Sequence, residues 1–277
     1  MLRRHRLKCA ALLLTLGLTF SHSTAPAAAQ AGSSNPTAKS SLTVDQVVSR
    51  MEQKNRERAE ALRKFRGVRV YRMEYHGFFS NREAEMTVNL DYTAPADKVF
   101  TVVSQSGTKF VIDHVFNALL DGEKEATSAE NQRRTALSAE NYNFTLASAD
   151  DSQDPAHYVL NVIPRTDNKF LYRGKVWIDA RDFAVTQVEA ELSKSPSFWI
   201  KKSEIRHRYE KVGDFWLPAE NKTESSIRLG GHAILSIEYK DYEITDAVSP
   251  ESVQTSRNAA ASSASGLAGD VAARNSD

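Results

Sequence analysis

The chain has 277 residues, with 36 basic and 35 acidic side chains and one cysteine. That length allows one large domain or two small ones. No block of Lys and Arg stands out beyond the first few residues, so the sequence lacks the electrostatic pattern of a nucleic-acid-binding protein. A single cysteine also excludes a disulfide within the chain.

Residues 1–31 are predicted to be a secretory signal peptide. Four basic residues precede the apolar run Cys9–Phe20, and small residues in A-x-A patterns follow. The run is shorter than the roughly 20 residues that cross a bilayer. We expect cleavage after Ala29 or Ala31 and a periplasmic location in a Gram-negative-type bacterium, with a retained amphipathic anchor as the alternative. Cleavage also removes Cys9, and it leaves 32 basic against 35 acidic residues, a net charge of about −3.

A polar linker, residues 32–41, leads into a predicted amphipathic helix from about Val44 to Lys64. Thr43 and Gln46 have the spacing of a capping box, which marks a helix start. Apolar side chains then recur at helical spacing, at Val44, Val47, Val48, Met51, Leu62 and Phe65.

From Val68 onward the apolar pattern has a period of two, which is typical of half-buried strands. The clearest example runs from Ala84 to Tyr92, and a shorter strand is predicted at Val99–Val103. Phe170–Asp179 and Ala184–Leu192 are expected to pair across a turn. A hairpin follows with its turn at Val212–Asp214, and then a last strand after Gly230 and Gly231. Short turns between consecutive strands favour an antiparallel meander.

A helical insertion, at about residues 111–140, interrupts the strands. It contains a compact apolar helix over Ile112–Leu120 and a more polar helix over Ser128–Glu140. Two strands near Asn143–Ser148 and Tyr158–Pro164 return the chain to the sheet. Residues 249–277 consist mainly of Ala, Ser, Asn and Gly, with almost nothing to bury, and are predicted to be a disordered tail, which leaves residues 42–248 as the folded domain.

The sequence contains no recognisable catalytic motif, metal-ligand spacing or cofactor fingerprint. We therefore expect no catalytic residue, no metal and no cofactor, and we treat a lipid hydrolase as a remote possibility. His207 falls between Ile205 and Tyr209 on the apolar side of its strand, where a partly buried histidine with satisfied hydrogen bonds is more common than a catalytic base. Lys202, Glu204, Arg206 and Arg208 fall on the opposite, solvated side.

A sheet of about ten strands tends to curl toward a barrel. Few helices are available to cover its apolar face, so an apolar hollow could remain for a ligand. The other interpretation is that the helices fill the concavity and form an ordinary core.

Three stretches, GKVWID with the turn ARDFAV, VGDFWLP, and IEYKDYEI, occur in an order that resembles the LolA/LolB-like superfamily of outer-membrane lipoprotein carriers. The resemblance covers about Val44 to Ile244. It implies an α+β fold, in which a curved antiparallel sheet forms an unclosed half-barrel and an N-terminal helix and inserted helices cover its concave face. Either Arg69 or Arg72 would occupy the region of the superfamily's first-strand arginine.

The resemblance implies a periplasmic carrier that binds lipid or lipoprotein acyl chains and ferries them toward the outer membrane, with lipoprotein-sorting components of both membranes as partners. The wall of the cavity would be the inward strand residues Met86, Val88, Leu90, Val176, Ile178, Val188, Trp199, Ile205, Leu235, Ile237 and Tyr239. The lid would be Val48, Met51, Ile112, Val115, Phe116, Leu119 and Leu120. The alternative is a periplasmic sensor or interaction module of the same fold that binds a protein partner.

Overall fold

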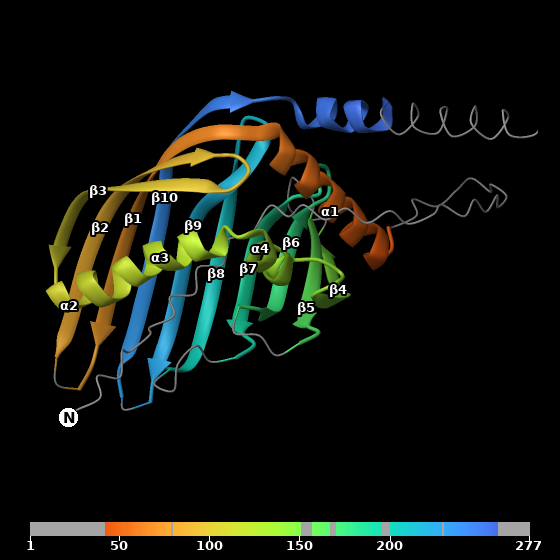
Figure 1. The fold of residues 1–277 in the computed structure, drawn as a ribbon. Coiled ribbons are helices and arrows are strands. Elements are labelled where there is room, and N and C mark those ends of the chain that lie inside the picture. Colours follow the sequence, from red (N-terminus) through yellow and green to blue (C-terminus); the bar gives the residue numbers. More distant parts are fainter. Residues whose placement is uncertain are drawn as a thin grey trace, which may run out of the picture.

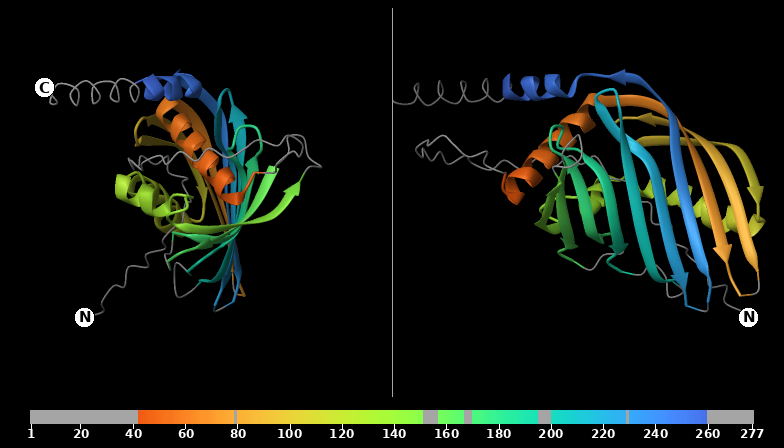
Figure 2. Two further views of the ribbon diagram at one scale, coloured as in Figure 1. Left: turned by 90° about the vertical axis from the view of Figure 1, so that its right-hand side faces the viewer. Right: turned by 180° about the vertical axis from the view of Figure 1, so that it is seen from behind.

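The computed structural model describes residues 42–78, 80–150, 157–166, 170–194, 200–228 and 230–259. Ten antiparallel strands form one curved sheet, and the helices lie on its concave side (Figures 1 and 2). The predicted α+β half-barrel is confirmed, since the sheet is not closed within the described residues. The strands are β1 (Leu62–His76), β2 (Asn81–Thr93), β3 (Asp97–Gly107), β4 (Tyr142–Asp150), β5 (His157–Pro164), β6 (Tyr172–Asp179), β7 (Val185–Leu192), β8 (Ile200–Val212), β9 (Phe215–Ile227) and β10 (His232–Ala247).

The strand order is β3-β2-β1-β10-β9-β8-β7-β6-β5-β4. All consecutive strands are neighbours except β3 and β4. The first strand pairs with the last, β1 with β10, in the interior of the sheet. The two edges, β3 and β4, are consecutive in the chain but lie at opposite ends. The segment between them must therefore cross the concave face.

That crossing segment is helical (Figure 1). It comprises α2 (Lys109–Val111), the π-helical turn η1 (Ile112–Phe116) and α3 (Asn117–Ala126), followed by α4 (Ala129–Thr135). We call residues 109–126 the lid segment. Helix α4 corresponds to the predicted polar helix over Ser128–Glu140. It ends at Thr135, so the prediction that it reaches Glu140 is wrong. The strand before the lid segment is longer than the predicted Val99–Val103, because its pairing with β2 extends from Asp97 to Gly107.

Helix α1 (Val44–Ala61) begins as predicted, with a complete capping box. The Thr43 hydroxyl accepts from the Gln46 amide at 3.3 Å, and the Gln46 side chain accepts from the Thr43 amide at 2.9 Å. The prediction that the helix continues to Lys64 is wrong, because Leu62 has extended backbone angles and begins β1. The helix-like spacing of Leu62 and Phe65 comes from register shifts in β1, which place both side chains in one apolar cluster.

The turns follow local sequence. Gly213 joins β8 to β9 with a φ of 59°, a left-handed conformation that glycine adopts without steric cost. Between β6 and β7 the Asp179 carboxylate accepts hydrogen bonds from the amides of Arg181 and Asp182, at 2.8 and 2.7 Å.

At the C-terminal end, residues 250–259 are helical. The prediction of a disordered tail from residue 249 is therefore wrong for this segment. Residues 260–277 lie outside the described part of the chain.

Candidate ligand-binding face

The concave face carries two separate apolar clusters, each beneath a different helix (Figure 1). Cluster 1 joins α1 to strands β4 to β7 and includes Val48, Met51, Val176, Ile178 and Val188. Cluster 2 joins the lid segment to β1, β2 and β10. It includes Met86, Val88, Phe116, Leu119, Leu120, Ile237 and Tyr239, with Ile112, Val115 and Leu235 packed against it.

The predicted wall and lid residues thus share one face but form two groups. Leu90 and Ile205 are buried as well. Trp199 lies outside the described residues. The sequence pattern identified the inward side chains, because alternation along a strand fixes the face. It did not show that one set packs under α1 and the other under the lid segment.

A buried ion cluster attaches the lid segment to the sheet. Arg69 of β1 is bonded to Glu123 of α3, and the Tyr71 hydroxyl donates to the same carboxylate at 3.1 Å. Lys98 of β3 lies 3.5 Å from the second carboxylate oxygen. The Arg69 guanidinium also stacks on two rings, Phe100 at 5.2 Å and Tyr239 at 5.0 Å. Two cations and one anion are therefore held together beneath α3.

Electrostatics favour the ionised form of this cluster. Burial by itself would raise the pKa of Glu123, but Arg69 and Lys98 lower it overall. Burial lowers the pKa of Lys98, and Glu123 opposes that shift. Arg72, the other arginine of the predicted first-strand region, lies on the convex face instead. It is paired in solvent with Glu85 at 2.8 Å and Glu238 at 3.3 Å.

The sequence missed the partners of Arg69. A signal for Arg69 itself was present, since it shares strand parity with buried Tyr71 and so falls on the apolar face. Glu123 and Lys98 carried no such signal. They lie 54 and 29 positions away in the chain, and only the crossing of the lid segment brings them to Arg69.

A polar seam runs along β8 and β9 on the same concave face. The hydroxyls of Ser203 and Ser225 are 2.8 Å apart, and His207 is the register partner of Asn221. All four side chains are buried. Neither ring nitrogen of His207 has a hydrogen-bond partner within the described residues. The predicted burial of His207 is therefore right, but its predicted satisfaction is wrong, and burial lowers its pKa to about 4.

Two tyrosines of cluster 1 also have buried hydroxyls without a hydrogen-bond partner among the described residues. Tyr142 and Tyr172 have ring centroids 5.4 Å apart, and neither hydroxyl is hydrogen-bonded within the described residues. The Tyr142 hydroxyl lies near the Tyr172 backbone without reaching hydrogen-bond geometry. Burial raises the pKa of Tyr172, and the neighbouring phenols Tyr142 and Tyr209 raise it further.

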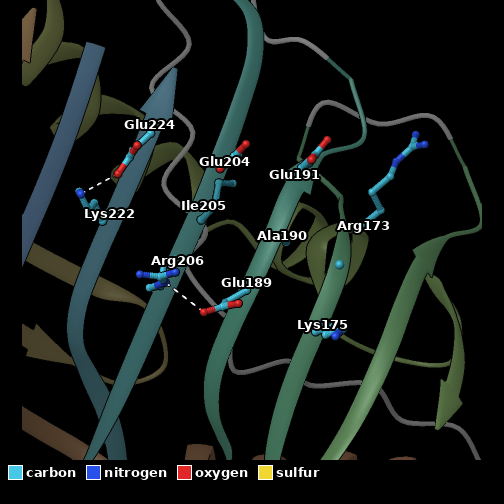
Figure 3. A pocket seen from close by; sticks show the side chains of 11 residues that line it. Arg173, Lys175, Glu189, Ala190, Glu191, Glu204, Ile205, Arg206, Lys222 and Glu224 are labelled. Carbon is cyan, nitrogen blue, oxygen red and sulfur yellow. Dashed lines mark hydrogen bonds and ion pairs between the residues drawn. The ribbon is translucent and has the colours of Figure 1, made fainter. Parts of the chain in front are cut away.

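The convex face is charged, as alternation along β8 predicts. A shallow groove of about 580 Å³ lies across β6 to β9 and is shown in Figure 3. Opposite charges pair along it, with Arg206 3.1 Å from Glu189 and Lys222 2.6 Å from Glu224. Exposed pairs of this kind contribute little to stability.

Potential metal-binding and membrane-spanning groups concern the described residues. There, no group of three or more His, Cys, Asp or Glu side chains is placed to hold a metal ion. No helix in that part of the chain is long and apolar enough to span a membrane.

Residues 135–240 match a family described as "Family of unknown function (DUF5686)". A search of curated protein sequences returns no match. Among solved structures, the chain is similar to a LolA superfamily protein from Nitrosomonas europaea, at 10% identity and a TM-score of 0.32, covering 75% of this chain and 96% of that one.

A putative outer membrane lipoprotein-sorting protein domain from Vibrio parahaemolyticus gives 10% identity and a TM-score of 0.35, covering 76% of this chain and 96% of that one. The Pseudomonas aeruginosa MucA/MucB complex gives 10% identity and a TM-score of 0.25, covering 68% and 93%.

Proposed function

We propose that this protein is a periplasmic carrier that binds acyl chains of lipids or lipoproteins against its concave face and ferries them toward the outer membrane. One observation supports this most directly. The apolar lid segment lies across an apolar, unclosed sheet, and it is joined to the sheet by side chains alone apart from its two ends. A cover of this kind can be displaced without unpairing any strand.

The proposed mechanism is physical and needs no bond making. The lid segment swings away, cluster 2 opens, and an acyl chain takes the place of lid side chains against β1, β2 and β10. Each CH₂ group removed from water contributes about 0.8 kcal/mol. The Arg69–Glu123 contact would hold the empty carrier shut, because opening breaks this ion pair and separates the two charges.

The first experiment is to purify the protein from its native envelope and identify co-purifying molecules by native mass spectrometry. A stoichiometric lipid or acylated protein is the expected result. A protein that carries no lipid, and that also fails to bind a dansyl-labelled fatty acid, would overturn the carrier proposal.

A pair of variants on one strand locates the binding face. Leu235 packs at the margin of cluster 2, and its neighbour Ile234 points to the convex side. We expect Leu235→Lys to weaken fatty-acid binding by tenfold or more, roughly the effect of placing one charge beside an acyl chain. Ile234→Lys should leave binding unchanged. Circular dichroism of both variants checks that they are folded, and equal binding by the two would place the ligand elsewhere.

A second candidate function is a periplasmic interaction module, which the charged convex groove favours. In that case, reversing the charge of Arg206 would remove a co-purifying protein while fatty-acid binding stayed absent in both forms. The carrier proposal expects the opposite pattern, with fatty-acid binding present and unaffected by Arg206→Glu.

A further inference from the structure

The concave face contains buried polar groups that the fold itself does not use. Both ring nitrogens of His207 and the hydroxyl of Tyr172 lack hydrogen-bond partners within the described residues. The two side chains are 2% and 1% exposed. Buried polar groups in folded proteins are nearly always hydrogen-bonded, to protein, water or ligand. Orphaned groups in a candidate binding face therefore point to something that completes them.

These groups belong to one contiguous patch. Tyr209 connects them, since its ring centroid lies 6.0 Å from that of His207 and its side chain packs against cluster 1, which contains Tyr172. Tyr142 extends the patch through its 5.4 Å ring contact with Tyr172. We call these four side chains the polar patch. It borders the apolar wall residues Val176 and Val188 of the same cluster.

We propose that the polar patch is a subsite for the ester carbonyls of an acyl ligand, with His207 and Tyr172 as hydrogen-bond donors. This inference rests on the proposed carrier function and names the ligand class. A neutral imidazole and a phenol each offer one N–H or O–H donor, and an ester carbonyl is an acceptor that arrives attached to an apolar chain. The acyl chain would then run from the patch across β9 toward Ile237 of cluster 2, because His207, Asn221 and Ile237 are register partners on adjacent strands.

The chemistry of the patch favours a neutral group over a carboxylate. In the described part of the chain, buried Arg69 and half-buried Lys98 are held by Glu123 beneath the lid segment. Buried Arg58 of α1 is held by the carbonyls of Asp182 and Phe183. Burial keeps His207 uncharged at neutral pH, because its pKa is lowered to about 4. A bound anion in the patch would therefore face no compensating charge, which is costly in a buried site. An ester carbonyl needs only the donors that are present.

The test compares two ligands of equal chain length, methyl dodecanoate and tetradecane, by displacement of a dansyl-labelled fatty acid from the delipidated protein. The alkane measures the apolar hollow, and the difference measures the patch. We expect the ester-to-alkane affinity ratio to be about threefold to tenfold higher in the wild type than in either patch variant, the contribution of one or two hydrogen bonds. Tyr172→Phe and His207→Leu should each reduce that preference and leave alkane binding unchanged.

The matched control is Tyr75→Phe, since the Tyr75 hydroxyl bonds the Gly230 carbonyl at the far end of β1. It should keep the wild-type preference. An ester-to-alkane affinity ratio that is the same in the wild type, Tyr172→Phe and His207→Leu would overturn the subsite and indicate that water occupies the patch. Failure of both ligands to displace the probe would instead overturn the carrier function, so the two failures are distinct.

Two further measurements separate a ligand role from a structural one. The ring-nitrogen NMR signals of His207 should shift with the ester and stay in place with the alkane. The ligand-free Tyr172→Phe variant should be at least as thermally stable as the wild type, because the hydroxyl it loses has no partner. A clear loss of stability would assign Tyr172 a structural hydrogen bond and contradict the proposal. Comparing a diacylglyceryl-cysteine peptide with a diacyl phospholipid then identifies which ester source binds more tightly.

Discussion

Glu123 is the residue on which the closure of the lid segment depends most. It is almost fully buried, and it accepts hydrogen bonds from Arg69 and Tyr71 while Lys98 lies beside it. Breaking a buried ion pair by removing one partner is far more costly than losing a pair at the surface, because the other charge remains buried. The convex pair of Arg72 and Glu85 offers the comparison.

Glu123→Gln is expected to lower the free energy of unfolding by about 3–5 kcal/mol, the usual cost of an unpaired buried charge. Glu85→Gln, at the surface, should cost about 0–1 kcal/mol. The pKa of Glu123 is lowered in the fold, so its contribution is complete above the ordinary glutamate pKa of about 4.3 and is lost as pH falls through the folded-state pKa. Urea titrations measure the free energy of unfolding at pH 7 and at pH 3. The decrease between these two pH values should therefore be smaller for Glu123→Gln than for the wild type.

His207 makes a separate contribution to pH dependence. Burial lowers its pKa to about 4, below the ordinary histidine pKa of about 6.5. The unfolded chain therefore binds a proton that the folded chain excludes, and stability falls as pH drops from about 6.5 toward 4. We expect the wild type to lose about 2 kcal/mol more than His207→Leu between pH 7 and pH 5. Exposed His232 supplies the control, and identical pH profiles for wild type and His207→Leu would contradict the burial.

At the scale of elements, the lid segment differs from every strand in how it is held. Strands β1, β2 and β10 are joined by continuous ladders of backbone hydrogen bonds. The lid segment meets the same strands through the side chains of cluster 2 and the Glu123 contacts. It also contains the π-helical turn η1, a feature frequently found at functional sites. The lid segment is therefore expected to open locally at a lower free energy than the strands of the sheet.

Leu119→Ala should accelerate amide hydrogen exchange in residues 109–126 by about thirtyfold or more, since removing a buried leucine side chain costs about 2–5 kcal/mol. Leu119 is fully buried between the lid segment and the sheet. Exchange in β6 and β7 should stay as in the wild type. Val188→Ala, which removes the same kind of contact from cluster 1, is the control and should leave the lid segment protected. Equal acceleration throughout the chain would mean that the lid segment does not open by itself.

At the scale of the whole molecule, the connection between the two sheet edges determines how the concave face is covered. The β1–β10 pairing places the first and last strands side by side inside the sheet and leaves β3 and β4 at opposite edges (Figure 2). Only a segment that crosses the face can join those edges. Helix α1 covers the other part of the face, so two covers rest on two separate apolar clusters.

Met51→Ala in cluster 1 and Leu119→Ala in cluster 2 should therefore act independently. Each is expected to cost about 2–5 kcal/mol. The double variant should equal the sum of the two within about 0.5 kcal/mol, as for residues without shared partners. Chemical denaturation of the four proteins measures this. A coupling of 1 kcal/mol or more would show that the concave face holds a single core.

The candidate site was predictable to the extent that local patterns determine it. Alternation placed Met86, Val88 and Ile237 on the inward face, because successive strand residues must point to opposite sides. It also placed His207 there without assigning a partner, and it left Arg69 and Arg72 as alternatives for the first-strand arginine. The hydrogen-bond partner of an inward side chain depends on which distant segment of the chain packs over it. For Arg69 that is the lid segment, and within the described residues nothing supplies one for His207.

The sequence by itself determined the α1 start at Thr43, the turn at Gly213 and the two faces of each strand, since these depend on interactions within a few residues. The tertiary structure decided the rest. The end of α1 at Ala61 follows from the pairing of Leu62 with Ala247, far along the chain. That same pairing separates the edges and directs the lid segment across the concave face, where apolar side chains pack in separate clusters under the lid segment and under α1. These features depend on the free energy of pairing strands that are far apart in the sequence. A local sequence pattern carries no information about that free energy.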